Sequence, residues 1–363
     1  IVSSNINDLR LCKTKGVYFM NIVVLAGGTS TERDVSIVTS VNVAKSLKRN
    51  GHNVNLIDVF LGTDKYKSSD EFFNEDNDFD KVEEELKART ADIPALIKER
   101  LENGEPFFGN SVLEYCKAAD IVFMGLHGAN GEDGKIQGTF DLLGIKYTGT
   151  GYLSSAISMD KELTKKVLVS EGVPMPKGVA LKKGHKLEYV PFPCVVKPCC
   201  GGSSVGVSIV QSEEDFNAAV EEAFTYEDNI LVEEYVNGRE FSVAVVDGKA
   251  LPVVEIVPLK GFYDYENKYK DGASEHISPA RIPDDITKKM QRWAEKACEA
   301  VGVTSYARVD QLLDKDNNIY CLEINTLPGM TPNSLIPIEA QAMGMSYDEL
   351  TQQLIDVSLK KYN

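Results

Sequence analysis

No apolar run in this 363-residue sequence is long enough to span a bilayer as a helix. Positive charge is also scarce, because 39 lysines and arginines stand against 55 aspartates and glutamates, which gives a formal net charge of −16. This balance argues against a nucleic-acid backbone or an acidic membrane surface as the principal partner. A local basic pocket can still bind a small anion. With 43% hydrophobic residues, the chain can bury one large core or two to three smaller ones.

Paired cysteine spacing is absent as well. The seven cysteines are an odd number, and no two of them form a CxxC pair. Cys194, Cys298 and Cys321 lie in apolar segments, which is typical of reduced, buried thiols in a cytosolic protein. Cys199 and Cys200 are adjacent, so a disulfide between them would be strained, and no His–Cys cluster near them suggests zinc.

The first residues show no export signal. Residues 1–19 lack the apolar core of a signal peptide, do not begin with methionine, and precede Met20, where a strong strand pattern starts. We therefore expect residues 1–19 to be a leader outside the fold, and we expect a cytoplasmic protein.

Strand and helix patterns alternate in the first part of the chain. Apolar runs at 20–26, 54–60 and 120–126 are typical of buried strands, and 35–50 has helical spacing. This alternation predicts an N-terminal α/β domain over 20–157, Rossmann-like, with a doubly wound parallel sheet. The acidic stretch 68–105, with a helical patch at 80–101, is expected to be a solvated surface insertion.

The pattern changes from residue 158 onward. Residues 158–173 are amphipathic and predict one helix, and strands and further helices follow, with antiparallel pieces among them. This predicts a two-lobed α+β region with a central lobe over 158–232 and a C-terminal lobe over 233–363. The predicted strands are 194–197, 205–210, 230–235 and a hairpin at 306–325, and the predicted helices are 213–224, 284–301 and 347–360.

A glycine–serine turn, KPCCGGSSVG at 197–206, joins two of the predicted strands. Backbone N–H groups in such a turn can converge on an anion, with Lys197 adding a cation. The spacing differs from GxxxxGK[ST], so the turn is not a Walker loop. On this segment alone, an anion-binding turn and a plain hairpin turn with an exposed lysine are equally supported.

The hairpin segment YARVDQLLDKDNNIYCLEINTLPGM, 306–330, carries a polar cluster. If Leu313 pairs with Tyr320, then Asp310 lies opposite Glu323, and the next polar pair joins the same face. Carboxylate and carboxamide oxygens suit Mg²⁺, and a neighbouring arginine can bind a phosphoryl group or a developing oxyanion. The alternative is a surface ladder of salt bridges. The predicted cluster is Arg308, Asp310, Glu323 and Asn325, and the residues expected to be buried are Val309, Leu312, Leu322 and Ile324.

Together, a cationic turn and a magnesium cluster indicate an ATP-using site. Lys161, on the helix that opens the second half, could contribute a further phosphate contact, and the alternative for it is a solvated helix face. The order of GGTSTERDVS, LHGANGEDGKIQG, SMDK, VKPCCGGSSVGVS, VEEYVNGREFSVAV, FYDYENKY, ARVD and LEINTLPGMTPNSLIP resembles the D-alanine–D-alanine ligases of the ATP-grasp superfamily. This resemblance runs from Met20 essentially to the C-terminus. It implies an ATP-grasp fold, with nucleotide held between two antiparallel sheets, and the ligation of two D-alanines for peptidoglycan synthesis.

The resemblance implies a set of nucleotide contacts. Lys161 and Lys197 match the lysines on the ATP phosphates, while Ser203 and Ser204 match the loop that closes over the γ-phosphate. Glu233, Glu234 and Val236 match the adenine contacts, the last two through their backbone. Glu240 matches the ribose contact.

Catalytic and metal roles are implied in the same way. Arg308 and the backbone N–H of Gly329 match the groups that stabilise the oxyanion. The matching Mg²⁺ ligands are Asp310, Glu323 and Asn325, with two ions expected and Mn²⁺ as a possible substitute.

The resemblance also implies substrate contacts. Glu32 matches the group that holds the first amino acid's ammonium, and His127 matches a histidine near the reacting groups. Ser334 matches a contact to the second amino acid's carboxylate, and Leu335 lines that subsite.

A tyrosine-rich loop at 261–278 is expected to cover the site. Three tyrosines within 263–269 argue against a disordered polar connection. Lys268 and Tyr269 match the mobile loop of the family, with Lys268 toward the nucleotide and Tyr269 hydrogen-bonded to Ser203, which is itself linked to Glu32. This loop would keep water from a D-alanyl phosphate intermediate.

Three functions stay open at this point. The first is ligation of two D-alanines, for which the family suggests a homodimer. The second is a sister ligase that takes D-serine or D-lactate as second substrate; the Lys268–Tyr269 pair disfavours lactate, whose users usually carry a histidine there. The third is a nucleotide-binding regulator without catalysis, which the intact cluster at 308–325 disfavours. In the turn, CCG replaces the arginine and acidic residue that the family often carries, so Cys199 and Cys200 are expected to be incidental.

Overall fold

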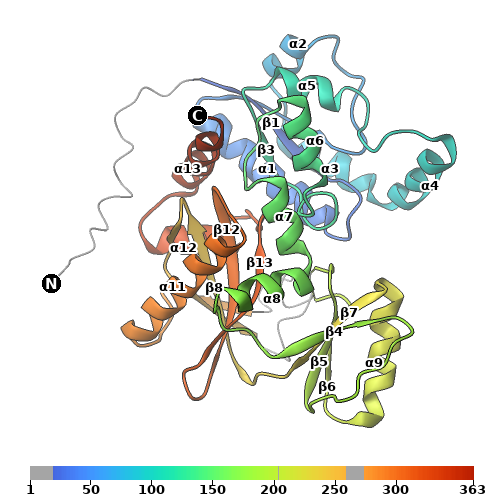
Figure 1. The fold of residues 1–363 in the computed structure, drawn as a ribbon. Helices are drawn as coiled ribbons and strands as arrows, with labels where there is room; N and C mark the ends of the chain where they lie inside the picture. The colour runs from blue at the N-terminus through green and yellow to red at the C-terminus, as the bar shows by residue number, and fades with distance from the viewer. Residues whose placement is uncertain (1–18, 203, 259–273) are drawn as a thin grey trace.

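The structure is a computed structural model that describes residues 19–202, 204–258 and 274–363. Three regions are visible in Figure 1: an N-terminal region around β1, a region of yellow-green strands covered by α9, and a C-terminal region around β8 and β12. No helix within these described ranges is long and apolar enough to cross a membrane.

The N-terminal region is the predicted α/β unit with a parallel sheet. Strands β1 (Asn21–Ala26), β2 (Asn53–Asp58) and β3 (Ile121–Met124) pair in parallel in the order β2-β1-β3. Alternate β1 residues enter two different cores, Ile22 on one face and Val23 on the other. Both faces are therefore covered, which explains the uninterrupted apolar runs. The surrounding helices are α1 (Arg33–Arg49), α5 (Val112–Ala118) and α6 (Lys135–Leu143).

The sequence predicted a solvated surface segment at 68–105, but this insertion is partly buried. It forms α2 (Ser69–Asn74), α3 (Phe79–Ala88), the 3₁₀ turn η2 (Thr90–Asp92) and α4 (Ile93–Asn103). Four apolar side chains anchor it to the domain, because Phe72, Phe73, Phe79 and Ile93 are buried. The acidic residues around these anchors conceal them in the sequence.

The predicted single helix at 158–173 is in fact two helices. Helix α7 (Tyr152–Met159) ends before Asp160, and α8 (Lys161–Ser170) begins after it. The Asp160 carboxylate accepts hydrogen bonds from the backbone N–H groups of Glu162 and Leu163, so Asp160 is the N-cap of α8.

The central region is a four-stranded antiparallel sheet in the order β4-β7-β5-β6, packed against α9 (Glu213–Tyr226). β6 is shorter than the predicted strand at 205–210. The strands are β4 (Gly178–Lys182), β5 (Cys194–Pro198), β6 (Ser208–Val210) and β7 (Asn229–Glu234).

The C-terminal region contains a second antiparallel sheet in the order β11-β10-β8-β12-β13, with β9 paired to β8. Helix α11 (Asp284–Ala300) packs against it, followed later by α12 (Leu335–Ala342), α13 (Tyr347–Leu359) and η3 (Lys360–Tyr362). The strands are β8 (Gly238–Val246), β9 (Lys249–Ala250), β10 (Val254–Pro258), β11 (Ser274–Ile277), β12 (Tyr306–Asp314) and β13 (Ile319–Asn325).

The β12–β13 hairpin has the predicted polar pairs but not the predicted turn register. Leu313 pairs with Ile319 rather than Tyr320, and a β-bulge shifts the register next to Asp310. The bulge restores the predicted pairing, so Asp310 lies opposite Glu323 and Arg308 opposite Asn325.

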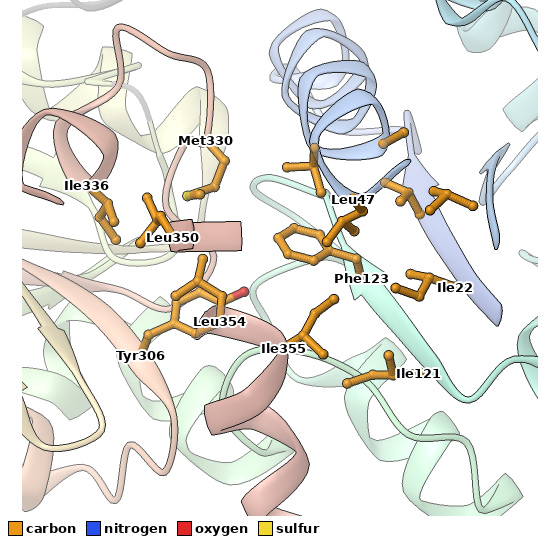
Figure 2. Close-up of a cluster of buried hydrophobic side chains, with 14 of the residues drawn as sticks. Ile22, Leu47, Ile121, Phe123, Tyr306, Met330, Ile336, Leu350, Leu354 and Ile355 are labelled. Carbon is orange, nitrogen blue, oxygen red and sulfur yellow. The ribbon is translucent and has the colours of Figure 1, made fainter. Parts of the chain in front are cut away.

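The N-terminal and C-terminal regions share one hydrophobic core. Ile22 and Phe123 of the parallel sheet pack in the same cluster as Leu350 and Leu354 of α13. Figure 2 shows these side chains meeting between the two regions, with Tyr306 of β12 beside them. Burial of this apolar surface holds the two regions together.

Candidate active site

Two adjoining cavities, of about 870 and 500 Å³, share Lys161, Gly201, Gly202 and Glu323 in their walls. The larger lies between the N-terminal region and the C-terminal sheet, and the smaller lies between the two antiparallel sheets. Every predicted site residue that the structure describes lines one or both of them. The predicted residues in the wall of the larger cavity are Glu32, His127, Lys161, Arg308, Glu323, Asn325, Gly329, Ser334 and Leu335. Those in the wall of the smaller cavity are Lys161, Lys197, Ser204, Glu233, Glu234, Val236, Glu240, Asp310 and Glu323.

The predicted oxygen cluster is located where the cavities meet. Arg308 binds Asp310 through two hydrogen bonds of 2.8 Å, and Asn325 donates to the same carboxylate at 3.1 Å. Lys161 Nζ lies 3.4 Å from Glu323 Oε2. Ion pairs do join these side chains, as in the alternative of a salt-bridge ladder, but they lie in the cavity walls and not on the outer surface. Two carboxylates and an amide oxygen on one face, with cationic counter-ions, fit a hard divalent cation.

The expectation that Leu312 and Leu322 are buried is wrong. Both are half-buried and line the smaller cavity, whereas Val309 and Ile324 are buried as predicted. Leu312 shares the face of Asp310 because side chains alternate along a strand. Leu322 is the extra residue of the bulge, and it therefore turns to the cavity together with Glu323.

Lys197 is not an exposed residue of a plain hairpin turn. It is 9% exposed, and its ammonium lies 2.5 Å from Glu233 Oε2. Lys165, which sequence reasoning missed, lies 2.6 Å from the other oxygen, Glu233 Oε1. These two lysines hold the pKa of the Glu233 carboxyl below its usual range, although burial alone would raise it.

The glycine–serine turn covers the junction of the cavities. Lys161 Nζ donates to the Gly201 carbonyl at 2.5 Å, and Ser204 has a φ of 58°. A Cβ on Gly202 would lie 3.1 Å from Glu32 Oε2, so the turn backbone approaches the first predicted subsite closely. The predictions for Ser203, Lys268 and Tyr269 concern residues outside the described ranges, as does most of the predicted loop at 261–278. The end of that predicted loop is not a loop, because residues 274–277 form strand β11, which pairs with β10.

The cysteines of the turn show no sign of activation. Loss of hydration, reinforced by the Glu227 carboxylate, raises the pKa of the buried Cys199 thiol and of the Cys200 thiol, although Cys200 as a residue is exposed, to about 12. Cys199 lies near Asp160 and Glu162, with one potential ligand atom of each within 4.8 Å of the others. Asp160 caps α8, however, and Glu162 pairs with Lys166 and Asn229, so these groups are already engaged. The structure describes six of the seven cysteines, and all six are free thiols.

The larger cavity contains a histidine with a defined tautomer. His127 Nδ1 lies 2.9 Å from the Leu327 carbonyl, which can only accept, so Nδ1 carries the proton. Nε2 then accepts from the Thr39 hydroxyl at 3.1 Å. Burial lowers the pKa of His127, which favours this neutral form.

Glu132 is a half-buried acidic residue that sequence reasoning missed. Its carboxylate lies in the wall of the larger cavity, and burial together with Glu32 raises its pKa to about 8. The motif GEDG could have indicated it, but nothing in the spacing distinguishes Glu132 from an exposed loop glutamate. His276 of β11 is also in this wall and was missed.

The predicted second subsite lies at the start of α12. Ser334 accepts a hydrogen bond from the Thr331 N–H at 3.1 Å, and Leu335 follows as the first helical residue. A Cβ on Gly329 would lie 2.9 Å from Ser334 Oγ, so only glycine leaves this approach open.

Comparison with known proteins agrees with the sequence motifs. Residues 21–150 match the family model of the D-ala D-ala ligase N-terminus, and residues 157–356 match that of the C-terminus. The D-alanine–D-alanine ligase of Pediococcus pentosaceus is 40% identical over 351 residues, covering 95% of this chain and 99% of the relative. That of Lacticaseibacillus casei is 38% identical, covering 94% and 97%.

Solved structures give the same result. The D-alanine–D-alanine ligase of Bacillus anthracis complexed with ATP has a TM-score of 0.72 and 29% identity, covering 94% of this chain and 98% of that one. The enzyme from Coxiella burnetii has a TM-score of 0.74 and 28% identity, with 95% of each chain covered. With both family models matched along most of its length, this chain belongs to the D-alanine–D-alanine ligase family.

Proposed function

We propose that this protein uses ATP to join two D-alanines, giving D-alanyl-D-alanine, ADP and phosphate for peptidoglycan precursor synthesis. The observation that carries the proposal is the oxygen cluster of Asp310, Glu323 and Asn325 at the junction of two cavities. One cavity is then the nucleotide site and the other the amino-acid site, so that the transferred phosphoryl group lies at their junction.

The nucleotide is assigned to the smaller cavity, between the two antiparallel sheets, as in an ATP-grasp fold. Apolar walls from both sheets suit an adenine ring, and acidic and backbone groups at the rim suit its amino group and the ribose. Lys161 and Lys197 bind the phosphates, with Ser204 and the backbone of the turn closing over them. The adenine and ribose contacts are Glu233, Glu234, Val236 and Glu240.

Magnesium is assigned to Asp310, Glu323 and Asn325. When bound there, Mg²⁺ would neutralise charge on the transferring phosphoryl group. Arg308 and Lys161 hold the two carboxylates in the present arrangement, so a cation would compete with these side chains.

The amino acids occupy the larger cavity. Glu32 binds the ammonium of the first D-alanine, whose carboxylate takes the γ-phosphoryl group of ATP and becomes an acyl phosphate, with release of ADP. Ser334 binds the carboxylate of the second D-alanine, and Leu335 lines the same subsite. The amine of this second molecule, after losing a proton, attacks the acyl carbon.

Arg308 and the Gly329 N–H stabilise the tetrahedral oxyanion, and phosphate then leaves as the peptide bond forms. His127, neutral and fixed by Leu327, lies in the same cavity as the reacting groups. We assign the covering role to the part of the predicted loop before β11, with Ser203, Lys268 and Tyr269, on the family resemblance alone.

Three further assignments accompany this function. Domains are placed at 20–157, 158–232 and 233–363, although β7 of the central sheet continues to Glu234. We propose a cytoplasmic location. A homodimer is proposed from the family and is tested by sedimentation.

The decisive experiment measures phosphate release and product mass with a panel of D-alanine, D-serine and D-lactate. We expect D-alanyl-D-alanine as the main product, with one phosphate per dipeptide. A main product that contains D-serine or D-lactate would show that this compound is the second substrate. Nucleotide binding without any product would show that the protein binds nucleotide but does not catalyse ligation.

A further inference from the structure

Lys165 is buried but belongs to neither cavity wall. It lies one turn after Lys161 on α8 and is 8% exposed. Its ammonium donates to the Pro176 carbonyl and lies 2.6 Å from Glu233 Oε1. Among the described residues, Lys161, Lys197 and Glu233 line the smaller cavity, whereas Lys165 lies behind Glu233.

Glu233 therefore has two lysine partners on opposite sides. Lys197 occupies the cavity side, at 2.5 Å from Oε2, and Lys165 occupies the rear side. One cation would be enough to neutralise one buried carboxylate, so the second lysine leaves this triad with a net positive charge. The net positive charge of this triad favours an anion next to Lys197, and the phosphates of a nucleotide are such an anion.

The side chain of Glu233 has little freedom to move. Gly178 pairs with it across the sheet, and a Cβ at Gly178 would lie 2.7 Å from Glu233 Cγ. The carboxylate is therefore held in place, and Lys197 is the partner that can turn toward the cavity.

Phosphate binding by Lys197 would weaken its ion pair with Glu233. A buried carboxylate that loses its counter-ion is strongly destabilised, and this penalty would be subtracted from the nucleotide affinity. Lys165 removes the penalty because it stays on Glu233 when Lys197 turns away.

We propose that Lys165 is a positioning residue that keeps Glu233 ionised and oriented, and so releases Lys197 to bind nucleotide phosphates. This inference rests on the proposed function in taking a nucleotide as the ligand of the smaller cavity. It adds a lysine that never touches the nucleotide and acts only through Glu233.

The test is calorimetric binding of Mg–ADP to the full chain. Lys165→Met is expected to weaken binding about tenfold or more, since coupled buried charges interact by roughly this amount. Adding Glu233→Gln to Lys165→Met is expected to restore affinity to within about threefold of Glu233→Gln alone, because a neutral amide needs no counter-ion. Lys166→Met, on the exposed side of the same helix, is the matched control and should bind normally.

Two results would overturn the inference. One is Lys165→Met binding Mg–ADP as tightly as the unchanged protein. The other is a double variant that stays tenfold weaker than Glu233→Gln, because Lys165 would then act without Glu233. Should Lys165→Met fail to fold, the comparison of Glu233→Gln with the double variant still decides. Normal Mg–ADP binding by the unchanged protein without any ligation product would contradict the proposed function and leave this inference standing.

Discussion

The carboxylate of Glu132 accepts a hydrogen bond from the backbone N–H of Leu327 at 3.2 Å, although the two residues are 195 positions apart in the sequence. The Leu327 carbonyl is bound at the same time by His127, at 2.9 Å. Both polar groups of one backbone residue are thus held by the loop after β3. This fixes the segment between β13 and Gly329 against the N-terminal region, and with it the predicted oxyanion site.

The pH dependence of stability should reflect Glu132. Its pKa is raised from 4.5 to about 8 in the folded protein, so between these values the folded state keeps a proton that the unfolded state has lost. Stability contributed by this group therefore falls as pH rises from about 4.5 to 8. We expect the free energy of unfolding of Glu132→Gln, measured with urea across this range, to depend less on pH than that of the unchanged protein, by the equivalent of about one proton. Glu84→Gln, at an exposed glutamate, should leave the pH profile unchanged, and an unchanged profile in Glu132→Gln would contradict the assignment.

Glu323→Ala should abolish ADP release in the presence of D-alanine. The substitution removes one of the two carboxylates assigned to Mg²⁺, and a loss of roughly 100-fold or more in kcat is expected from a missing metal ligand. A coupled assay for ADP measures it, with thermal unfolding to show that the variant is folded. Asp316→Ala, at the exposed turn of the same hairpin, is the control. Near-normal turnover in Glu323→Ala would remove the metal assignment.

Thr90→Val tests whether the insertion supports the amino-acid site. The Thr90 hydroxyl accepts a hydrogen bond from Arg33 Nε at 3.3 Å and donates one to Asp34 Oδ1 at 2.7 Å. Both partners directly follow Glu32 in the sequence. Valine keeps the shape and removes both hydrogen bonds, so the KM for D-alanine should rise by about two- to tenfold, with the KM for ATP unchanged. Thr225→Val, on α9, is the matched control. Equal KM values in Thr90→Val and the unchanged protein would limit the insertion to a structural role.

Cys200→Ser should keep normal ligation kinetics. The Cys200 thiol has a pKa of about 12, so almost no thiolate is present near neutral pH. Iodoacetamide at pH 7.5 should therefore react with Cys200 slowly, as measured by mass spectrometry. A tenfold loss of kcat in Cys200→Ser, or alkylation as fast as that of a free model thiol, would show that the cysteine is not incidental.

The clustering of the predicted site residues was easier to predict from the sequence than the details of the fold. That Asp310, Glu323 and Asn325 share a face could be predicted, because side chains alternate along a strand and the turn residues limit the possible registers of the hairpin. The bulge at Leu322 was not visible, since it depends on the neighbouring strands. Lys165 was missed because a lysine four residues after Lys161 looks like one side of a solvated helix, and its burial depends on β7, which is far away in the sequence. Asp160 could have been recognised, because an aspartate before a helical run is a common N-cap.

The common core in Figure 2 also limits how the protein can open. Because α13 packs into the same cluster as the parallel sheet, separating these two regions would expose a large apolar surface to water. The four-stranded sheet with α9 is joined to the rest of the chain by two covalent connections, the segments 171–177 and 235–237. Rotation of that sheet about these two segments would leave the common core intact. Pro176, whose carbonyl accepts a hydrogen bond from Lys165, lies in the first of them, so this connection and the buried lysine are in direct contact.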